Sequence, residues 1–110
     1  MSENDHEHPV FWRQMDGVSL SRLAACEGTP LYVYSASHIR GRIRALREAL
    51  AGMDAGIRYA VKANGNVAIL QLLAAEGAGA DIVSGGEMER ALRAGMPAGD
   101  IVFSGVGKSD

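Results

Sequence analysis

The chain has 110 residues, of which 47% are hydrophobic and 22% are charged, and its formal net charge is -2. These values are ordinary for a globular domain and exclude the strongly basic surface that binds nucleic acids or anionic membranes, so neither is an expected partner. The single cysteine, Cys26, excludes an internal disulfide, no apolar run is long enough to span a bilayer, and the polar, acidic start is unlike a signal peptide. We therefore expect a cytoplasmic protein.

The first residues are predicted to form a polar tail that leads into two large aromatic side chains. His6 and His8 are spaced to share a metal ion, but no third ligand accompanies them, and we predict no metal site. Phe11 and Trp12 would face opposite sides of a strand, so both sides need cover. Nothing else in the chain obviously supplies that cover.

Beyond this segment, strands and helices alternate about every twenty residues. Apolar and β-branched runs predict strands over 31–34, 57–61, 81–84 and 101–104. Helical spacing and capping residues predict helices over 20–25, from Ser35 to Gly52, from Asn66 to Gly77 and from Gly86 to Gly95. This alternation indicates a parallel sheet with right-handed crossovers. Four arginines of the long helix lie mostly off its apolar face and predict a solvated surface: Arg40, Arg42, Arg44 and Arg47.

Lys62 ends one of the predicted buried strands, in the sequence Tyr59-Ala60-Val61-Lys62-Ala63-Asn64. Burying an ammonium group is costly, so the amine either reaches solvent at the strand end or is used chemically. A desolvated lysine amine is suited to forming imines with carbonyl compounds. The residue alone leaves both readings open. The polar residues after the neighbouring strands favour the second, because parallel α/β folds bind ligands at that edge.

Two carboxylates lie near this predicted edge. Asp81 opens the next predicted strand, where it would either hold a cation or an imine or simply cap the strand. Glu87 follows Gly85-Gly86 at a predicted helix start, where a carboxylate interacts favourably with the helix dipole, so taken alone it is structural.

A glycine-rich stretch, Gly105-Val106-Gly107-Lys108-Ser109, is superficially like the phosphate-binding loop of nucleotide hydrolases. That loop needs a glycine where this chain has Val102, and a helix after the serine. We reject this reading and expect a tight turn, one that lets the backbone approach a ligand.

Four segments together resemble the N-terminal part of diaminopimelate decarboxylases, which are fold-type III pyridoxal-phosphate enzymes. The lysine segment is shared with decarboxylases of ornithine and arginine, whereas Ser-Gly-Gly-Glu and Phe-Ser-Gly-Val-Gly-Lys are more like the diaminopimelate branch. The segments follow family order and spacing over most of the chain from Thr29 onward: 29–34, 59–64, 79–87 and 102–108.

The resemblance implies that residues 29–110 form the first βα units of an alanine-racemase-like (β/α)8 barrel, or TIM barrel. Residues 1–28 would be a tail and a segment joining a separate β-domain, which would cover Phe11 and Trp12. Lys62 would hold pyridoxal phosphate through an imine, with Asp81 and Glu87 lining the cofactor pocket. The implied reaction is decarboxylation of meso-2,6-diaminopimelate to L-lysine, the last step of lysine biosynthesis, by a homodimer.

The chain departs from the family in length, because a (β/α)8 barrel takes roughly 250 residues. We therefore expect an incomplete barrel that alone is marginally folded and inactive, since its sheet would expose apolar surface and unpaired edges. Two alternatives stay open. One is decarboxylation of another basic amino acid, such as ornithine, arginine or lysine, and the other is a non-catalytic module that binds pyridoxal phosphate or pairs with a complete subunit.

Overall fold

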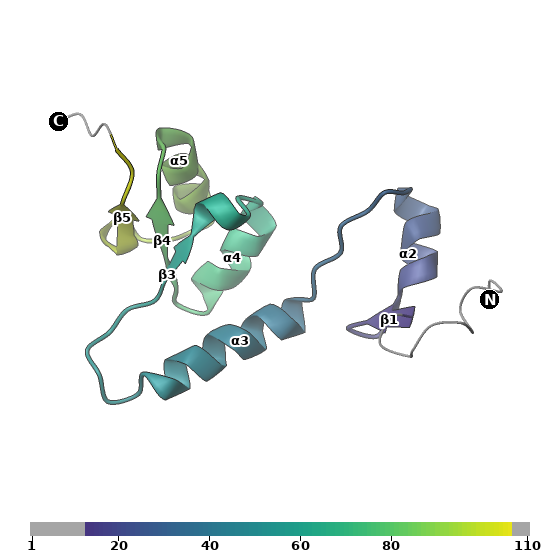
Figure 1. Ribbon diagram of the computed structural model, residues 1–110, viewed down its shortest axis with the longest axis horizontal. Helices are drawn as coiled ribbons and strands as arrows, with labels where there is room; N and C mark the ends of the chain where they lie inside the picture. The colour runs from purple at the N-terminus through teal and green to yellow at the C-terminus, as the bar shows by residue number, and fades with distance from the viewer. Residues whose placement is uncertain (1–12, 107–110) are drawn as a thin grey trace. The chain divides into compact units, whose positions relative to one another are not determined.

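The computed structural model of the chain describes residues 13–106 (Figure 1). These residues divide between His38 and Ile39 into two compact units. No helix in the described part of the chain is long and apolar enough to cross a membrane. The predicted roles of His6, His8, Phe11 and Trp12, and the turn at Gly107, fall outside residues 13–106.

The first unit begins with a small hairpin that the sequence analysis did not predict. Strand β1 (Gln14–Met15) pairs antiparallel with β2 (Val18–Ser19). The turn between them is Asp16-Gly17, and both residues have positive φ, as a tight two-residue hairpin turn requires. The Ser19 hydroxyl then caps helix α2 (Leu20–Glu27), which confirms the predicted short helix.

The prediction of a strand over residues 31–34 is wrong. The segment 31–35 has no regular secondary structure, and the Tyr32 side chain is 87% exposed. β-branched and aromatic residues favour strands because they pack well on a half-buried pleated surface. No strand in residues 13–106 pairs with this segment, and without a partner its β-favouring composition does not produce a strand.

Helix α3 (Ala36–Ala49) is the longest helix of the described residues, as predicted. The Ser35 hydroxyl accepts a hydrogen bond from the His38 amide at 3.0 Å and so caps its start. Gly52, with φ of 84°, follows its end. Its apolar side is anchored by the buried Ile43.

The arginines of α3 are exposed as predicted, yet three of them gather around one carboxylate. Arg44 donates two hydrogen bonds to Glu76, at 2.8 and 3.1 Å, while Arg40 and Arg47 each lie 4.0 Å from it. These contacts lower the pKa of Glu76, chiefly through the hydrogen bond from Arg44, and raise that of Arg44. Helical periodicity alone could not reveal a partner 32 residues away in the chain.

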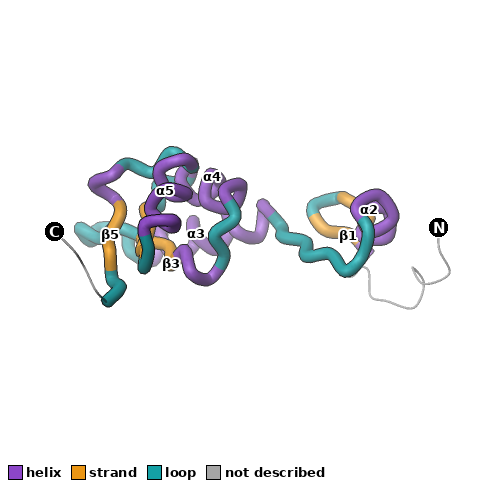
Figure 2. The backbone as a smooth tube through the Cα atoms, turned by 90° about the horizontal axis from the view of Figure 1, so that it is seen from above, coloured by secondary structure: helices purple, strands orange, loops and turns teal. Residues whose placement is uncertain are grey.

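The second unit is built on a three-stranded parallel sheet, which confirms the predicted sheet type. Its strands lie in the order β3 (Arg58–Ala60), β4 (Gly79–Ile82) and β5 (Ile101–Phe103). The connections contain α4 (Val67–Ala75), α5 (Gly85–Arg93) and the short 3-10 turns η2 (Val61–Ala63) and η3 (Ala98–Asp100). Figure 1 and Figure 2 show these strands alternating with the helices along the chain.

One face of the sheet forms the hydrophobic core. The register aligns Tyr59 with Ala80 and Ala80 with Ile101, so these side chains share a face. That face packs against apolar residues of α4 and α5, where Leu70 and Ala91 have no exposed surface. The buried apolar residues are Ile43, Val61, Leu70, Leu73, Ala78, Ala80, Ile82, Ala91, Ala94 and Met96.

The opposite face of the sheet is open in the described residues. Val83 and Val102 on this side are 41% and 49% exposed. At the amino end of the strands, an ion pair of 3.2 Å joins Arg58 of β3 to Asp100. It passes over Gly79 of β4, where a β-carbon would collide with the backbone oxygen of Asp100 and with the Arg58 side chain. Glycine at this position therefore makes the bridge possible.

Candidate functional site

Lys62 lies in η2, immediately after β3 at the carboxyl edge of the sheet. The strand ends at Ala60, earlier than predicted, and is half-buried because only one of its faces is covered. Val61 is 1% exposed and anchors the turn in the core, whereas Lys62 is exposed. Within residues 13–106, no carboxylate forms an ion pair with its amine. The amine therefore reaches solvent and is open to a ligand.

The turn that carries Lys62 is held by hydrogen bonds of the residues that follow it, Asn64 and Asn66. The Tyr59 hydroxyl donates to the backbone oxygen of Asn64 at 3.1 Å. The Asn64 side chain accepts from the Asn66 amide at 3.0 Å, and Asn66 in turn caps α4 by accepting from Ala68 at 2.9 Å. The predicted capping role of Asn66 is confirmed.

Asp81 lies inside β4, which begins at Gly79 and not at Asp81 as predicted. Asp81 follows Ala80, which is on the covered face, so the Asp81 side chain faces the open side of the sheet. The register aligns Asp81 with Ala60 of β3, and Lys62 lies two residues after Ala60. The Ser104 hydroxyl, at the end of β5, donates a hydrogen bond to the Asp81 carboxylate. A cap at the strand start is thus excluded, and the carboxylate is held at the open face.

Glu87 has a capping role in the described contacts. Its carboxylate accepts a hydrogen bond from the Val83 amide at 2.9 Å, and its own amide donates to the Ser84 hydroxyl at 3.2 Å. This reciprocal pair is a variant of the capping box at the start of α5. The structural role at the helix start, which was predicted for Glu87 taken alone, is confirmed. A role for Glu87 toward a cofactor stays a prediction.

Gly105 makes a close approach within the chain. A β-carbon there would lie 2.9 Å from the Phe103 ring and 3.2 Å from the backbone oxygen of Val83. The absence of a side chain therefore lets the chain after β5 pass close to the end of β4.

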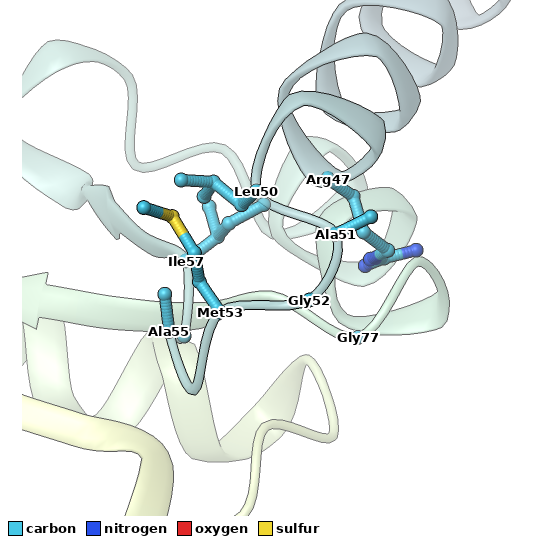
Figure 3. A pocket seen from close by; sticks show the side chains of 9 residues that line it. Arg47, Leu50, Ala51, Gly52, Met53, Ala55, Ile57 and Gly77 are labelled. Atoms are coloured by element: carbon cyan, nitrogen blue, oxygen red, sulfur yellow. The ribbon is translucent and has the colours of Figure 1, made fainter.

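A hollow of about 280 Å³ lies elsewhere, between the end of α3 and the segment that leads into β3 (Figure 3). Arg47, Leu50, Met53 and Ile57 line it, together with Gly77 before β4. These segments precede the strands, so the hollow is at the amino edge of the sheet. Lys62 and Asp81 are not among its lining residues.

The residues at the carboxyl edge fit a carbonyl cofactor such as pyridoxal phosphate. Lys62 supplies an accessible amine for a covalent bond to an aldehyde, and Asp81 supplies a carboxylate that Ser104 holds in place. Nothing lies within 4 Å of the position of a β-carbon at Gly85, so this part of the edge has room for a ligand.

Comparison with known proteins agrees with this chemistry. The family model described as "Pyridoxal-dependent decarboxylase, pyridoxal binding domain" matches residues 36–110. The chain belongs to this family. A diaminopimelate decarboxylase from Pseudomonas aeruginosa is 55% identical over 94 residues, which are 86% of this chain and 23% of that protein. The chain thus spans about a quarter of the length of the curated relatives that it matches.

Solved structures of decarboxylases have the same fold. Diaminopimelate decarboxylase from Helicobacter pylori, in complex with L-lysine, matches with a TM-score of 0.76 and 47% identity, over 81% of this chain and 23% of that one. A lysine/ornithine decarboxylase from Vibrio vulnificus, complexed with cadaverine, matches with a TM-score of 0.74 and 29% identity, over 82% and 24%. The fold class predicted from the sequence, the first βα units of a (β/α)8 barrel, is confirmed by this likeness.

Proposed function

We propose that this chain is the lysine-bearing part of a pyridoxal-phosphate-dependent diaminopimelate decarboxylase, which converts meso-2,6-diaminopimelate to L-lysine. The observation that carries the proposal is the accessible amine of Lys62 at the carboxyl edge of a pyridoxal-binding domain. The diaminopimelate relatives are 38–55% identical to the chain, whereas the lysine/ornithine enzyme is 29% identical, which favours the former substrate.

The residues of this chain have separate parts in the proposed activity. Bound pyridoxal phosphate supplies an electron sink for the carbon that loses carbon dioxide. Lys62 would hold the cofactor through its amine, and Asp81, whose carboxylate is fixed by Ser104, would face a cationic group of the cofactor. Glu87 shapes the edge by fixing the start of α5 next to β4.

Reduction with borohydride tests the role of Lys62. The complete gene product, loaded with pyridoxal phosphate, is reduced and digested, and the pyridoxyl group is located by mass spectrometry. We expect the label on Lys62. A label on Lys108, or no label on either lysine, would overturn the assignment and, in the second case, favour a non-catalytic module.

Substrate profiling tests the reaction. Release of carbon dioxide from meso-diaminopimelate should exceed release from ornithine, arginine and lysine when each is supplied at the same concentration. The second candidate is decarboxylation of another basic amino acid, which the likeness to the lysine/ornithine decarboxylase favours. Preference for one of these three amino acids would establish that reaction instead.

We also propose the wider organisation that the family resemblance implies. Residues 1–28 join a separate β-domain and residues 29–110 belong to the barrel, in a cytoplasmic homodimer. The single cysteine and its exposure on α2 fit a reducing compartment. Light scattering on the purified complete gene product should give twice the mass of its polypeptide, and a mass equal to one polypeptide would contradict the dimer.

A further inference from the structure

The turn that carries Lys62 is short and has no side-chain cap of its own. It consists of Val61–Ala63, and Ala60 before it contributes no capping hydrogen bond. Two of its three residues, Lys62 and Ala63, are exposed, so packing holds only its first residue. The position of the Lys62 amine therefore depends on how the residue after the turn, Asn64, is fixed.

Asn64 is fixed by two hydrogen bonds. The Tyr59 hydroxyl donates to its backbone oxygen at 3.1 Å, and its side chain accepts from the Asn66 amide at 3.0 Å. The next residue is Gly65, which lies close to the Arg90 side chain of α5, because a β-carbon there would be 2.8 Å from Nη1 of Arg90.

Tyr59 is itself well anchored for this contact. Its ring lies on the covered face of the sheet and packs against the hydrophobic core, and its backbone is aligned with the fully buried Ala80. The hydroxyl therefore reaches Asn64 from a ring that packs against the core, while Lys62 is exposed to solvent. A hydrogen bond from a core residue is a rigid link, because the ring has little freedom to move.

We propose that Tyr59 is a positioning residue for Lys62. Its hydroxyl donates a hydrogen bond to Asn64 and thereby holds the turn Val61–Ala63 in the conformation that accepts the cofactor. The inference rests on the proposed function, because it takes Lys62 as the lysine that binds the cofactor. Without this hydrogen bond, the turn populates other conformations. The apparent affinity for the cofactor then falls in proportion to the fraction of molecules whose turn is in the binding conformation.

The test is a titration of Tyr59→Phe with pyridoxal phosphate, using the cofactor-free complete gene product. At each concentration the protein is reduced with borohydride and the pyridoxyl label on Lys62 is quantified. We expect half-maximal labelling at about fivefold higher concentration, as the loss of one hydrogen bond to a partly buried carbonyl oxygen implies. Tyr32→Phe, at a tyrosine that is 87% exposed in the other unit, is the matched control and should label like the parent.

A second pair of variants tests the same turn without changing the core. Asn64→Ala removes the acceptor of the Asn66 amide and should weaken labelling, whereas Asn64→Asp keeps an oxygen there and should restore it. Even if Tyr59→Phe does not fold, this pair tests whether the fixing of Asn64 sets the position of Lys62, which the positioning role of Tyr59 requires. Parent-like labelling of Tyr59→Phe, or parent-like labelling of both Asn64 variants, would overturn the positioning role and leave the proposed function intact. Failure of the parent protein to label at Lys62 would instead overturn the proposed function.

Discussion

Asp16 is the residue whose charge is most strongly set by its surroundings within residues 13–106. It lies in the hairpin turn of the first unit, and its carboxylate accepts hydrogen bonds from the hydroxyls of Ser37 and Ser35, at 2.5 and 2.7 Å, and from the Ser37 amide at 3.2 Å. These donors lower its pKa from 3.8 to about 2, with the Ser37 hydroxyl as the largest cause. The charged carboxylate thus joins the hairpin to the first turn of α3.

The pH dependence of this link follows from the direction of the shift. Because the pKa is lower in the folded chain, the contribution to stability is complete above pH 3.8 and is lost as the pH falls toward about 2. A carbon-detected NMR titration should give a midpoint near pH 2 for Asp16, and the Ser37 amide signal should move with it. Replacing both Ser35 and Ser37 with alanine should raise the midpoint toward 3.8. A midpoint near 3.8 in the unchanged protein would contradict the link.

At the scale of elements, the absence of a side chain at Gly79 lets Arg58 and the Asp100 backbone approach β4 at the amino end of the sheet. A β-carbon at this position would meet the Asp100 backbone, which cannot move without disturbing the pairing of β4 with β5. We expect Gly79→Ala to lower the free energy of unfolding by about 1–3 kcal/mol, as overpacking typically does. Urea denaturation of the complete gene product, followed by circular dichroism, measures the change.

Gly41 provides the matched control for this substitution. It lies in the interior of α3, its φ is not in the left-handed region, and nothing is within 4 Å of its β-carbon position. Gly41→Ala should therefore raise the free energy of unfolding, by about 0.5–1 kcal/mol, because alanine loses less backbone entropy in a helix. Equal effects of the two substitutions would show that the crowding at Gly79 is relieved elsewhere.

At the scale of the whole molecule, the open face of the sheet limits what 110 residues can do alone. Val83 and Val102 are half-exposed there, and β3 and β5 each have one edge without a partner in the described residues. We expect the isolated 110-residue polypeptide to aggregate or to melt without cooperativity. A sharp thermal transition in a monomeric preparation, seen by calorimetry and by circular dichroism alike, would contradict this expectation.

The sequence predicted the parts of the molecule that are local in the chain. The parallel strands, the cap at Asn66 and the lysine just beyond a strand follow from periodicity and from residue type within a few positions. The hairpin was missed although Asp16-Gly17 is a typical turn pair. The contact of Asp81 with Ser104 joins residues 23 positions apart, and only the register of the strands reveals it.

The bridge of Arg58 to Asp100 over Gly79 has a consequence for recombination between relatives. Its three residues come from three successive stretches of the chain, and the positions of Arg58 and Asp100 leave no room for a side chain at Gly79. A relative with a larger residue at the position of Gly79 must have a different arrangement at the other two positions. Chimeras that exchange one βα unit with such a relative will therefore carry a mismatch at the amino end of the sheet, whereas exchange of the span from Arg58 to Asp100 as one block keeps the three residues together.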